Sequence, residues 1–119
     1  MYNTLERYLQ TVVNAVWNYA GRSKTYEDHL MNATLGLVGE AGEVADIVKK
    51  MQFHTEKPFE HFRPQLVLEL GDVLFYYMKF LEIVGITLEE VIEYNKYKLS
   101  SRHPELGEVS ERFPEGYIR

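Results

Sequence analysis

The chain has 119 residues, of which 45% are hydrophobic and 26% are charged, and this is sufficient for one globular domain with its own core. Its net charge of −5 and isoelectric point near 5.4 argue against nucleic acid or an anionic membrane surface as the main partner. The absence of cysteine excludes disulfides, zinc–thiolate sites and cysteine nucleophiles.

Two helices are predicted in the N-terminal half. Residues 4–20 carry an apolar stripe at helical spacing, and Gly21 suits the C-cap that ends this segment. The stripe consists of Leu5, Leu9, Val12, Val13, Val16 and Ala20. A long second helix runs to about residue 53, with Thr25 or Asp28 as its N-cap.

Two further helices are predicted in the C-terminal half. Pro58 and Pro64 interrupt the chain after the second helix, and Pro64 lies near the first turn of a third helix predicted over about residues 63–84. Thr87 and Glu90 have the spacing of a capping box, which begins a fourth helix that runs to about residue 101.

No stretch of the chain alternates between polar and apolar residues with a period of two, so no sheet is predicted. The short connections favour antiparallel neighbours. We therefore predict an all-α fold, a four-helix bundle, in a single domain over residues 1–102. Residues 103–119 are polar and punctuated by Gly and Pro, and they are predicted to form a loosely ordered tail.

The stretch LGLVGEAGEVADIVKK, residues 35–50, has helical periodicity although it contains three glycines. Each glycine inside a helix costs about 1 kcal/mol relative to alanine. Glu40 and Glu43 are three residues apart in this stretch and therefore share a helix face. They border the predicted apolar stripe of the second helix, which consists of Leu37, Ala41, Val44, Val48 and Met51.

The third predicted helix repeats this arrangement. Glu69 and Asp72 are again three residues apart, and Glu-Leu-Gly-Asp parallels the Glu-Ala-Gly-Glu of the second helix. They border a stripe made of Leu66, Leu70, Val73, Tyr77 and Val84. Two antiparallel helices of this kind can bring four carboxylates to one place beside the core.

Four clustered carboxylates repel one another, and a hard divalent cation that prefers oxygen ligands resolves the repulsion. This favours Mg²⁺, with Mn²⁺ as an alternative. Solvated acids on the helix surface are the competing interpretation. A di-iron site is not indicated, because no histidine follows an acid at the required spacing. Gly42 and Gly71 lie away from both the stripes and the acids, which favours close approach by another helix or subunit.

These residues resemble the MazG-like nucleoside triphosphate pyrophosphohydrolases of the all-α NTP pyrophosphatase superfamily. That family has a Glu-Glu-x-x-Glu stretch followed, after a spacer, by Glu-x-x-Asp. Glu40 and Glu43 match the end of the first motif, and Glu69 and Asp72 match the second. Gly39 replaces the first Glu, as the phage-type branch of the family tolerates.

The resemblance covers about residues 30–104 and includes a third motif near the end of the fourth helix. The matching residues are Asn95, Lys98, Leu99, Arg102 and Pro104. Lys98 and Arg102 are four residues apart and share a helix face, which makes them candidates for phosphate contacts. A solvated basic helix end is the alternative interpretation. Arg112, within RFPEGY, is a weaker second match to the same motif.

The resemblance implies hydrolysis of a nucleoside triphosphate to the monophosphate and pyrophosphate. Mg²⁺ held by the four acids would bind the triphosphate, and Glu43 or Glu40 would act as general base. Asn95 and Tyr76 join Lys98 and Arg102 as candidate substrate-binding residues. Removal of damaged or excess nucleotides is the implied role. The alternative is a non-catalytic helical dimerisation or regulatory module.

Several weaker candidates stay open at this point. Asp46 continues the acidic series as an extra ligand or a solvated acid, and His54 lies in the loop after the second helix. Trp17 and Phe75 either stack on a base or pack in the core, and core packing is the favoured interpretation.

A thin four-helix core and bare glycines favour a homo-oligomer, most simply a two-fold dimer, with a tetramer of such dimers as an alternative. The N-terminal residues MYNTLER do not form a signal peptide, and no apolar run is long enough to span a bilayer. The sequence therefore predicts a soluble, cytoplasmic protein.

Overall fold

The computed structural model describes residues 4–21 and 25–106. The chain divides into two compact units, one ending at Val84 and the other beginning at Gly85, and each is described by itself. All regular structure in the described residues is helical, in four helical stretches and one short 3₁₀ turn, so the predicted all-α class is confirmed. The predicted single domain over residues 1–102 stays a prediction.

The N-terminal stretch contains a π-helical turn that the sequence did not predict. It runs through α1 (Thr4–Tyr8), the π-helix η1 (Leu9–Val13) and α2 (Asn14–Ala20). The wider π turn rotates the following residues about the helix axis. Val13 is buried, as the predicted stripe placed it, and Trp17 is buried beside it, whereas Val12 and Val16 of the same stripe are exposed.

Local chemistry at the ends of α2 and α3 agrees with the sequence. Gly21 ends α2 with a φ of 60°, in the left-handed region that favours glycine. In front of α3 (Tyr26–Phe53), Thr25 Oγ1 accepts from the Asp28 N–H at 3.1 Å, and Asp28 Oδ2 accepts from the Thr25 N–H at 3.2 Å. Thr25 is therefore the N-cap, and Asp28 completes its capping box.

The next helix, α4 (Phe59–Val84), begins earlier than predicted. Its first turn opens directly after Pro58, whose carbonyl accepts from the His61 N–H at 3.0 Å. Pro64 consequently lies inside the helix, so the predicted start at about residue 63 was wrong. A proline so close to the N-terminus removes only one backbone hydrogen bond, to a carbonyl of the opening turn.

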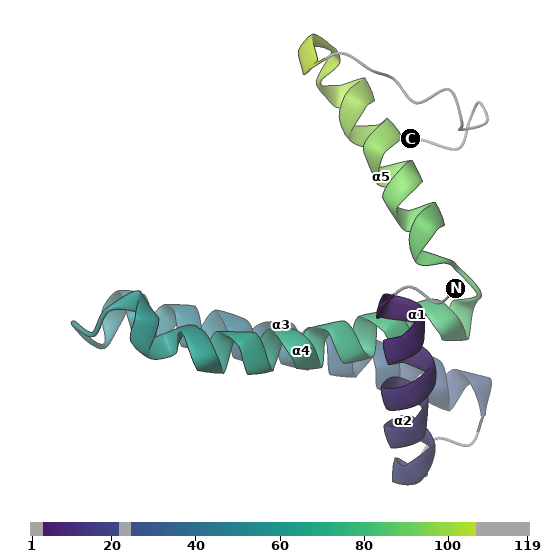
Figure 1. Ribbon diagram of the computed structural model, residues 1–119, viewed down its shortest axis with the longest axis horizontal. Coiled ribbons are helices and arrows are strands. Elements are labelled where there is room, and N and C mark those ends of the chain that lie inside the picture. The colour runs from purple at the N-terminus through teal and green to yellow at the C-terminus, as the bar shows by residue number, and fades with distance from the viewer. Residues whose placement is uncertain (1–3, 22–24, 107–119) are drawn as a thin grey trace. The chain divides into compact units, whose positions relative to one another are not determined.

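Helices α3 and α4 form an antiparallel hairpin, and the N-terminal stretch crosses it near the end away from the α3–α4 loop (Figure 1). The predicted stripe of α3 is confirmed only in part, because Leu37, Val44 and Met51 are half-buried and Ile47, which the stripe did not include, is buried. Glu40 and Glu69 are half-buried, whereas Ala41, Val48 and Leu70, which were predicted to be in the stripes, are exposed. Glu40 and Glu69 are thus partly covered at the edge of the α3–α4 interface, whereas Asp72 is exposed.

One glycine of the 35–50 stretch is explained by close packing within the chain. A Cβ atom at Gly36 would lie 2.2 Å from the ring of Tyr76 on α4, so only glycine lets the two helices meet there. Among the described residues nothing lies within 4 Å of the corresponding position at Gly39, Gly42 or Gly71. Close approach by a second subunit at Gly42 and Gly71 stays a prediction.

The second unit contains α5 (Leu88–Arg102) and a short 3₁₀ turn, η2 (Pro104–Leu106). Thr87 Oγ1 accepts from the Glu90 N–H at 3.1 Å, and Glu90 Oε2 accepts from the Thr87 N–H at 2.9 Å. The predicted capping box is thereby confirmed. Arg112 and most of the predicted tail lie outside the described residues.

Candidate metal centre

Three of the four predicted carboxylates meet where α3 passes α4. One oxygen atom from each of Glu40, Glu69 and Asp72 lies within 4.8 Å of the others. Glu40 and Glu69 are half-buried and Asp72 is exposed, so the group is held by the interface on one side and open to solvent on the other. We call these three residues the acidic cluster.

Glu43, the fourth predicted ligand, does not belong to this group of three. It lies one turn after Glu40 on α3 and its side chain is exposed. Its charge nevertheless acts on Glu40, as the electrostatics of the cluster show. Glu43 therefore lies beside the cluster, and its role as a fourth ligand stays a prediction.

The carboxylates of the acidic cluster lie close enough to repel one another electrostatically. Partial burial raises the pKa of Glu40 above its usual range, and the charges of Asp72 and Glu69 raise it further. A hydrogen bond with Glu69 and the charge of Glu43 act in the same direction. Each of these effects disfavours the ionised form of Glu40, and a bound cation would reverse that balance.

The donor set fits a hard divalent cation. All three ligand groups are carboxylates, which Mg²⁺ and Mn²⁺ prefer, and the solvent-exposed side leaves room for water or phosphate oxygens. Among the described residues, no lysine or arginine forms an ion pair with Glu40, Glu69 or Asp72.

Tyr8 on α1 is a neighbour of the cluster that the sequence did not reveal. Burial raises the pKa of the Tyr8 phenol, and the charge of Asp72 raises it further. Tyr8 therefore lies close enough to Asp72, the solvent-exposed member of the cluster, for that charge to act on its phenol. No motif could have indicated it, because the contact depends on how the N-terminal stretch crosses α4.

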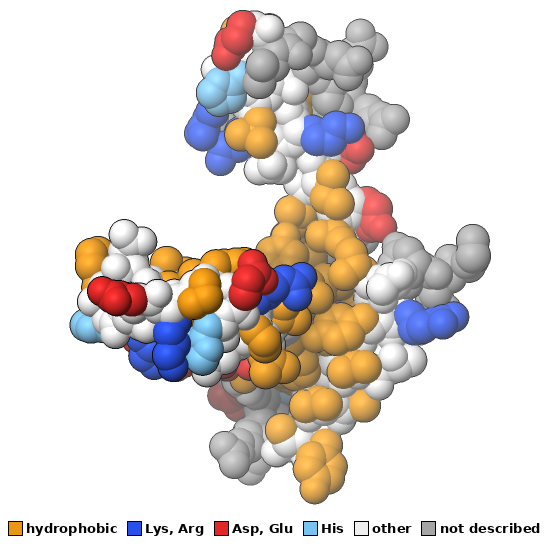
Figure 2. All heavy atoms as spheres, turned by 60° about the vertical axis from the view of Figure 1, so that its left-hand side comes forward, with side chains coloured by type: hydrophobic (Ala, Val, Ile, Leu, Met, Phe, Trp, Pro, Cys, Tyr) orange, Lys and Arg blue, Asp and Glu red, His pale blue; other side chains and the backbone are white. Residues whose placement is uncertain are grey.

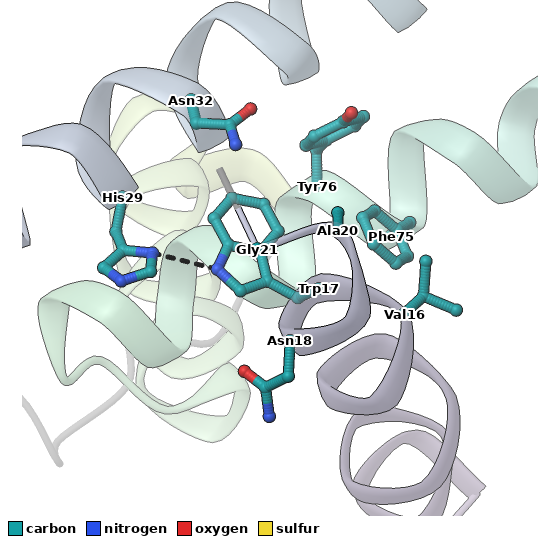
Figure 3. Close-up of a pocket in the computed structure, with 9 residues that line it drawn as sticks. All are labelled: Val16, Trp17, Asn18, Ala20, Gly21, His29, Asn32, Phe75 and Tyr76. Atoms are coloured by element: carbon teal, nitrogen blue, oxygen red, sulfur yellow. Dashed lines mark hydrogen bonds between the residues drawn. The ribbon is translucent and has the colours of Figure 1, made fainter. Parts of the chain in front are cut away.

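A cavity of about 350 Å³ opens between α2, α3 and α4 on the first unit. Figure 3 shows Trp17 at its centre, with Phe75 and Tyr76 of α4 on one side and His29 of α3 on the other. Trp17 Nε1 donates a hydrogen bond to His29 Nδ1 at 2.9 Å. The indole also makes aromatic contacts with Phe75 and Tyr76, each with ring centroids 6.4 Å apart.

Helices α3 and α4 contribute residues both to the cavity and to the acidic cluster. Asn32, which lines the cavity, lies two turns before Glu40 on α3, about 12 Å along the helix axis. Tyr76, on the other wall, lies one turn after Asp72 on α4. Tyr76, Trp17 and Phe75 were indicated by the sequence as candidates for contact with the nucleotide. His29 and Asn32 were not, because a single His or Asn on a helix forms no motif.

Trp17 is buried, in agreement with the favoured interpretation of core packing, and it also forms a wall of the cavity. Asp46 forms an exposed ion pair with Lys50 at 3.1 Å, which agrees with a solvated acid. His54 is exposed after the end of α3 and lines a separate shallow cavity with Lys50 and His61.

The other predicted substrate-binding residues lie in the second unit. Asn95 and Arg102 are exposed on α5, and Lys98 is half-buried there. The two units are not placed relative to one another, so the predicted phosphate contacts of Lys98 and Arg102 stay predictions.

Comparison with known proteins agrees with this arrangement. Residues 29–107 match the MazG nucleotide pyrophosphohydrolase domain, and the match includes the whole acidic cluster. The chain is also 37% identical over 89 residues to the Gene 37 protein of Mycobacterium phage L5, covering 74% of this chain and 77% of that protein. No solved structure matches the chain. Among the described helices none is long and apolar enough to cross a membrane. The chain belongs to the MazG nucleotide pyrophosphohydrolase family, and its phage relative fits the phage-type branch.

Proposed function

We propose that this protein is a Mg²⁺-dependent nucleoside triphosphate pyrophosphohydrolase that releases the nucleoside monophosphate and pyrophosphate. The observation that carries the proposal is the meeting of Glu40, Glu69 and Asp72, with ligand atoms within 4.8 Å of one another. Family membership supports the reaction class.

In the proposed reaction, a water oxygen attacks the α-phosphorus and the bond from this phosphorus to the bridging oxygen breaks, so that pyrophosphate leaves. A bound Mg²⁺ supplies charge neutralisation for the triphosphate and its transition state. Glu40, Glu69 and Asp72 would hold that ion. Of the two candidate bases, Glu43 is the better placed, because it lies beside the cluster rather than within it.

The cavity beside the cluster supplies a place for the nucleoside. Its walls combine the aromatic rings of Trp17, Phe75 and Tyr76 with the amide of Asn32, a mixture suited to a planar heterocycle with polar edges. Asn32, Phe75 and Tyr76 lie on α3 and α4, the helices that carry the carboxylates. A bound nucleotide would place its phosphates at the metal and its base in the cavity.

We also propose that the protein acts as a homo-oligomer, most simply a dimer. Met31, Leu35 and Val38 occupy one face of α3 and are 60%, 62% and 66% exposed. Gly42 continues this face with the same spacing, and Val67, Leu70 and Leu74 of α4 are exposed as well. Figure 2 shows apolar side chains gathered over a broad area of the surface. A second copy of the chain would cover these apolar side chains, and its close approach would explain the glycine at position 42.

The proposal is tested by incubating the protein with a panel of ribo- and deoxyribonucleoside triphosphates and Mg²⁺, and by identifying the phosphate product. We expect pyrophosphate, and at least about a 100-fold loss of kcat/KM in Glu43→Gln and Asp72→Asn. Glu60→Gln, an exposed acid near the start of α4, serves as the matched control and should remain active.

Two results would point elsewhere. Orthophosphate as the product would indicate different chemistry at the same cluster. The absence of turnover with every nucleotide, at high protein concentration and with Mg²⁺ or Mn²⁺, would favour a non-catalytic dimerisation or regulatory module.

A further inference from the structure

A buried lysine next to the cavity has no role in the proposed chemistry. Lys79 of α4 is only 8% exposed, and it is the one charged residue among the buried residues of the described chain. Burial of an ammonium group is unfavourable unless its donors are satisfied, and a hydrophobic residue of the same shape often gives equal or greater stability. Lys79 is therefore poorly explained as a contribution to stability alone.

Lys79 makes two hydrogen bonds to specific neighbours. Its Nζ atom donates to Glu82 Oε1 at 2.7 Å and to Asn14 Oδ1 at 3.0 Å, and Asn14 Nδ2 donates to Glu82 Oε2 at 3.0 Å. These contacts close a triad between α2 and α4. An ammonium group has three donors, and the triad uses two of them.

The ammonium group of Lys79 also lies near the ring of Trp17. Lys79 Nζ lies 5.2 Å from the centroid of the Trp17 ring, within the range of a cation–π interaction. Trp17 also donates to His29 Nδ1 and contacts the rings of Phe75 and Tyr76. The indole is thus in contact with side chains of both α3 and α4.

We propose that the triad of Asn14, Lys79 and Glu82 positions Trp17 as a rigid wall of the nucleoside cavity, so that Lys79 sets the affinity for the substrate without touching the reacting atoms. The proposal rests on the proposed function, because it assigns the cavity to the nucleoside. Its physical basis is preorganisation, because a side chain already ordered in the free protein loses less entropy when the ligand binds.

Tryptophan fluorescence reports on Trp17 alone, because Trp17 is the single tryptophan of the chain. In the full-length protein, we expect Lys79→Met to shift the Trp17 emission to the red and to increase its quenching by acrylamide. For the nucleotide that the wild-type protein hydrolyses best, KM should rise about tenfold with kcat close to wild type, which corresponds to about 1.4 kcal/mol of binding. Lys79→Arg, which retains the charge and the donors, should restore most of both properties.

Lys49→Met is the matched control, because Lys49 is an exposed lysine on α3 about 20 residues along the helix from His29. It should leave fluorescence and kinetics unchanged. Circular dichroism establishes that each variant is folded. If Lys79→Met does not fold, Glu82→Ala takes its place, because Glu82 lies at the solvent edge of the triad with 36% of its side chain exposed.

A folded Lys79→Met or Glu82→Ala protein with wild-type quenching overturns the proposal, whether or not the protein is active. Increased quenching with unchanged KM also overturns it, because Trp17 would then be loosened without effect on the substrate. If the wild-type protein hydrolyses no nucleotide, the proposed function fails, and the quenching comparison still decides whether Lys79 positions Trp17.

Discussion

Glu40 of α3 and Glu69 of α4 interact across the interface of the helical hairpin, where both side chains are half-buried. An apolar pair at these positions would stabilise the hairpin, so the carboxylates weaken the metal-free protein at the place where its two longest helices meet. The two carboxylates are therefore expected to favour cation binding while they lower the stability of the metal-free hairpin.

In Mg²⁺-free buffer, Glu69→Gln should unfold at the same temperature as the wild-type protein or at a higher one, because one of three repelling charges is removed. Added Mg²⁺ should raise the unfolding temperature of the wild-type protein and have little effect on the variant. Thermal unfolding followed by circular dichroism, with and without Mg²⁺, measures both. A wild-type protein whose stability does not respond to Mg²⁺ or Mn²⁺ would contradict the assignment of the cluster.

Gly36→Ala should destabilise the hairpin, because the added Cβ would overlap the ring of Tyr76, which Trp17 and Phe75 hold in place. Overpacking of this kind costs about 1–3 kcal/mol, against a gain of about 1 kcal/mol in helix propensity. Gly39→Ala is the control. Nothing described lies near its added Cβ, so this variant should be as stable as the wild type or up to about 1 kcal/mol more stable. Urea unfolding of both variants measures the difference, and equal stabilisation of the two would exclude the packing explanation.

Val38→Glu should dissociate the proposed oligomer, because it places a charge in the exposed apolar face of α3. Val48→Glu is the comparison, since Val48 is also exposed on α3 but lies off the face that Met31, Leu35 and Val38 share. Sedimentation velocity of both variants and of the wild type gives their masses. A monomeric wild-type protein would rule out the dimer directly.

The triad around Lys79 predicts a dependence of stability on pH. Burial alone would raise the pKa of Glu82, but hydrogen bonds from Lys79 and Asn14 and the charge of Lys79 outweigh it, so the pKa lies below its ordinary value of 4.5. The carboxylate therefore stabilises the fold above that ordinary value, and this contribution is lost as the pH falls through the lowered pKa.

Urea unfolding between about pH 6 and pH 3 measures this loss, with Glu82→Gln as the reference, because the variant cannot titrate at this position. The difference in unfolding free energy between the two proteins should shrink as the pH falls. A constant difference over this range would mean that the Glu82 carboxylate makes no ionised contact with Lys79 in solution.

Local rules determined much of this protein from its sequence. The capping boxes at Thr25 and Thr87 and the left-handed Gly21 depend only on residues a few positions apart, and the structure contains all three. The all-α class followed from the helical period, and the paired acids with the third motif identified the family. Each capping signal and each single motif lies within one helix or at its ends.

Only the tertiary structure decided which side of each helix is buried. Helix α3 has two apolar faces, one against α4 and one exposed, and a period of 3.6 residues does not tell them apart. For this reason Glu40 is partly covered at the edge of the interface, whereas Ala41, which was predicted to be in the stripe, is exposed. The N-terminal π turn and the contacts of Lys79, Trp17 and His29 likewise depend on helices far apart in the chain. Their positions follow from packing among three helices, which no single stretch of sequence specifies.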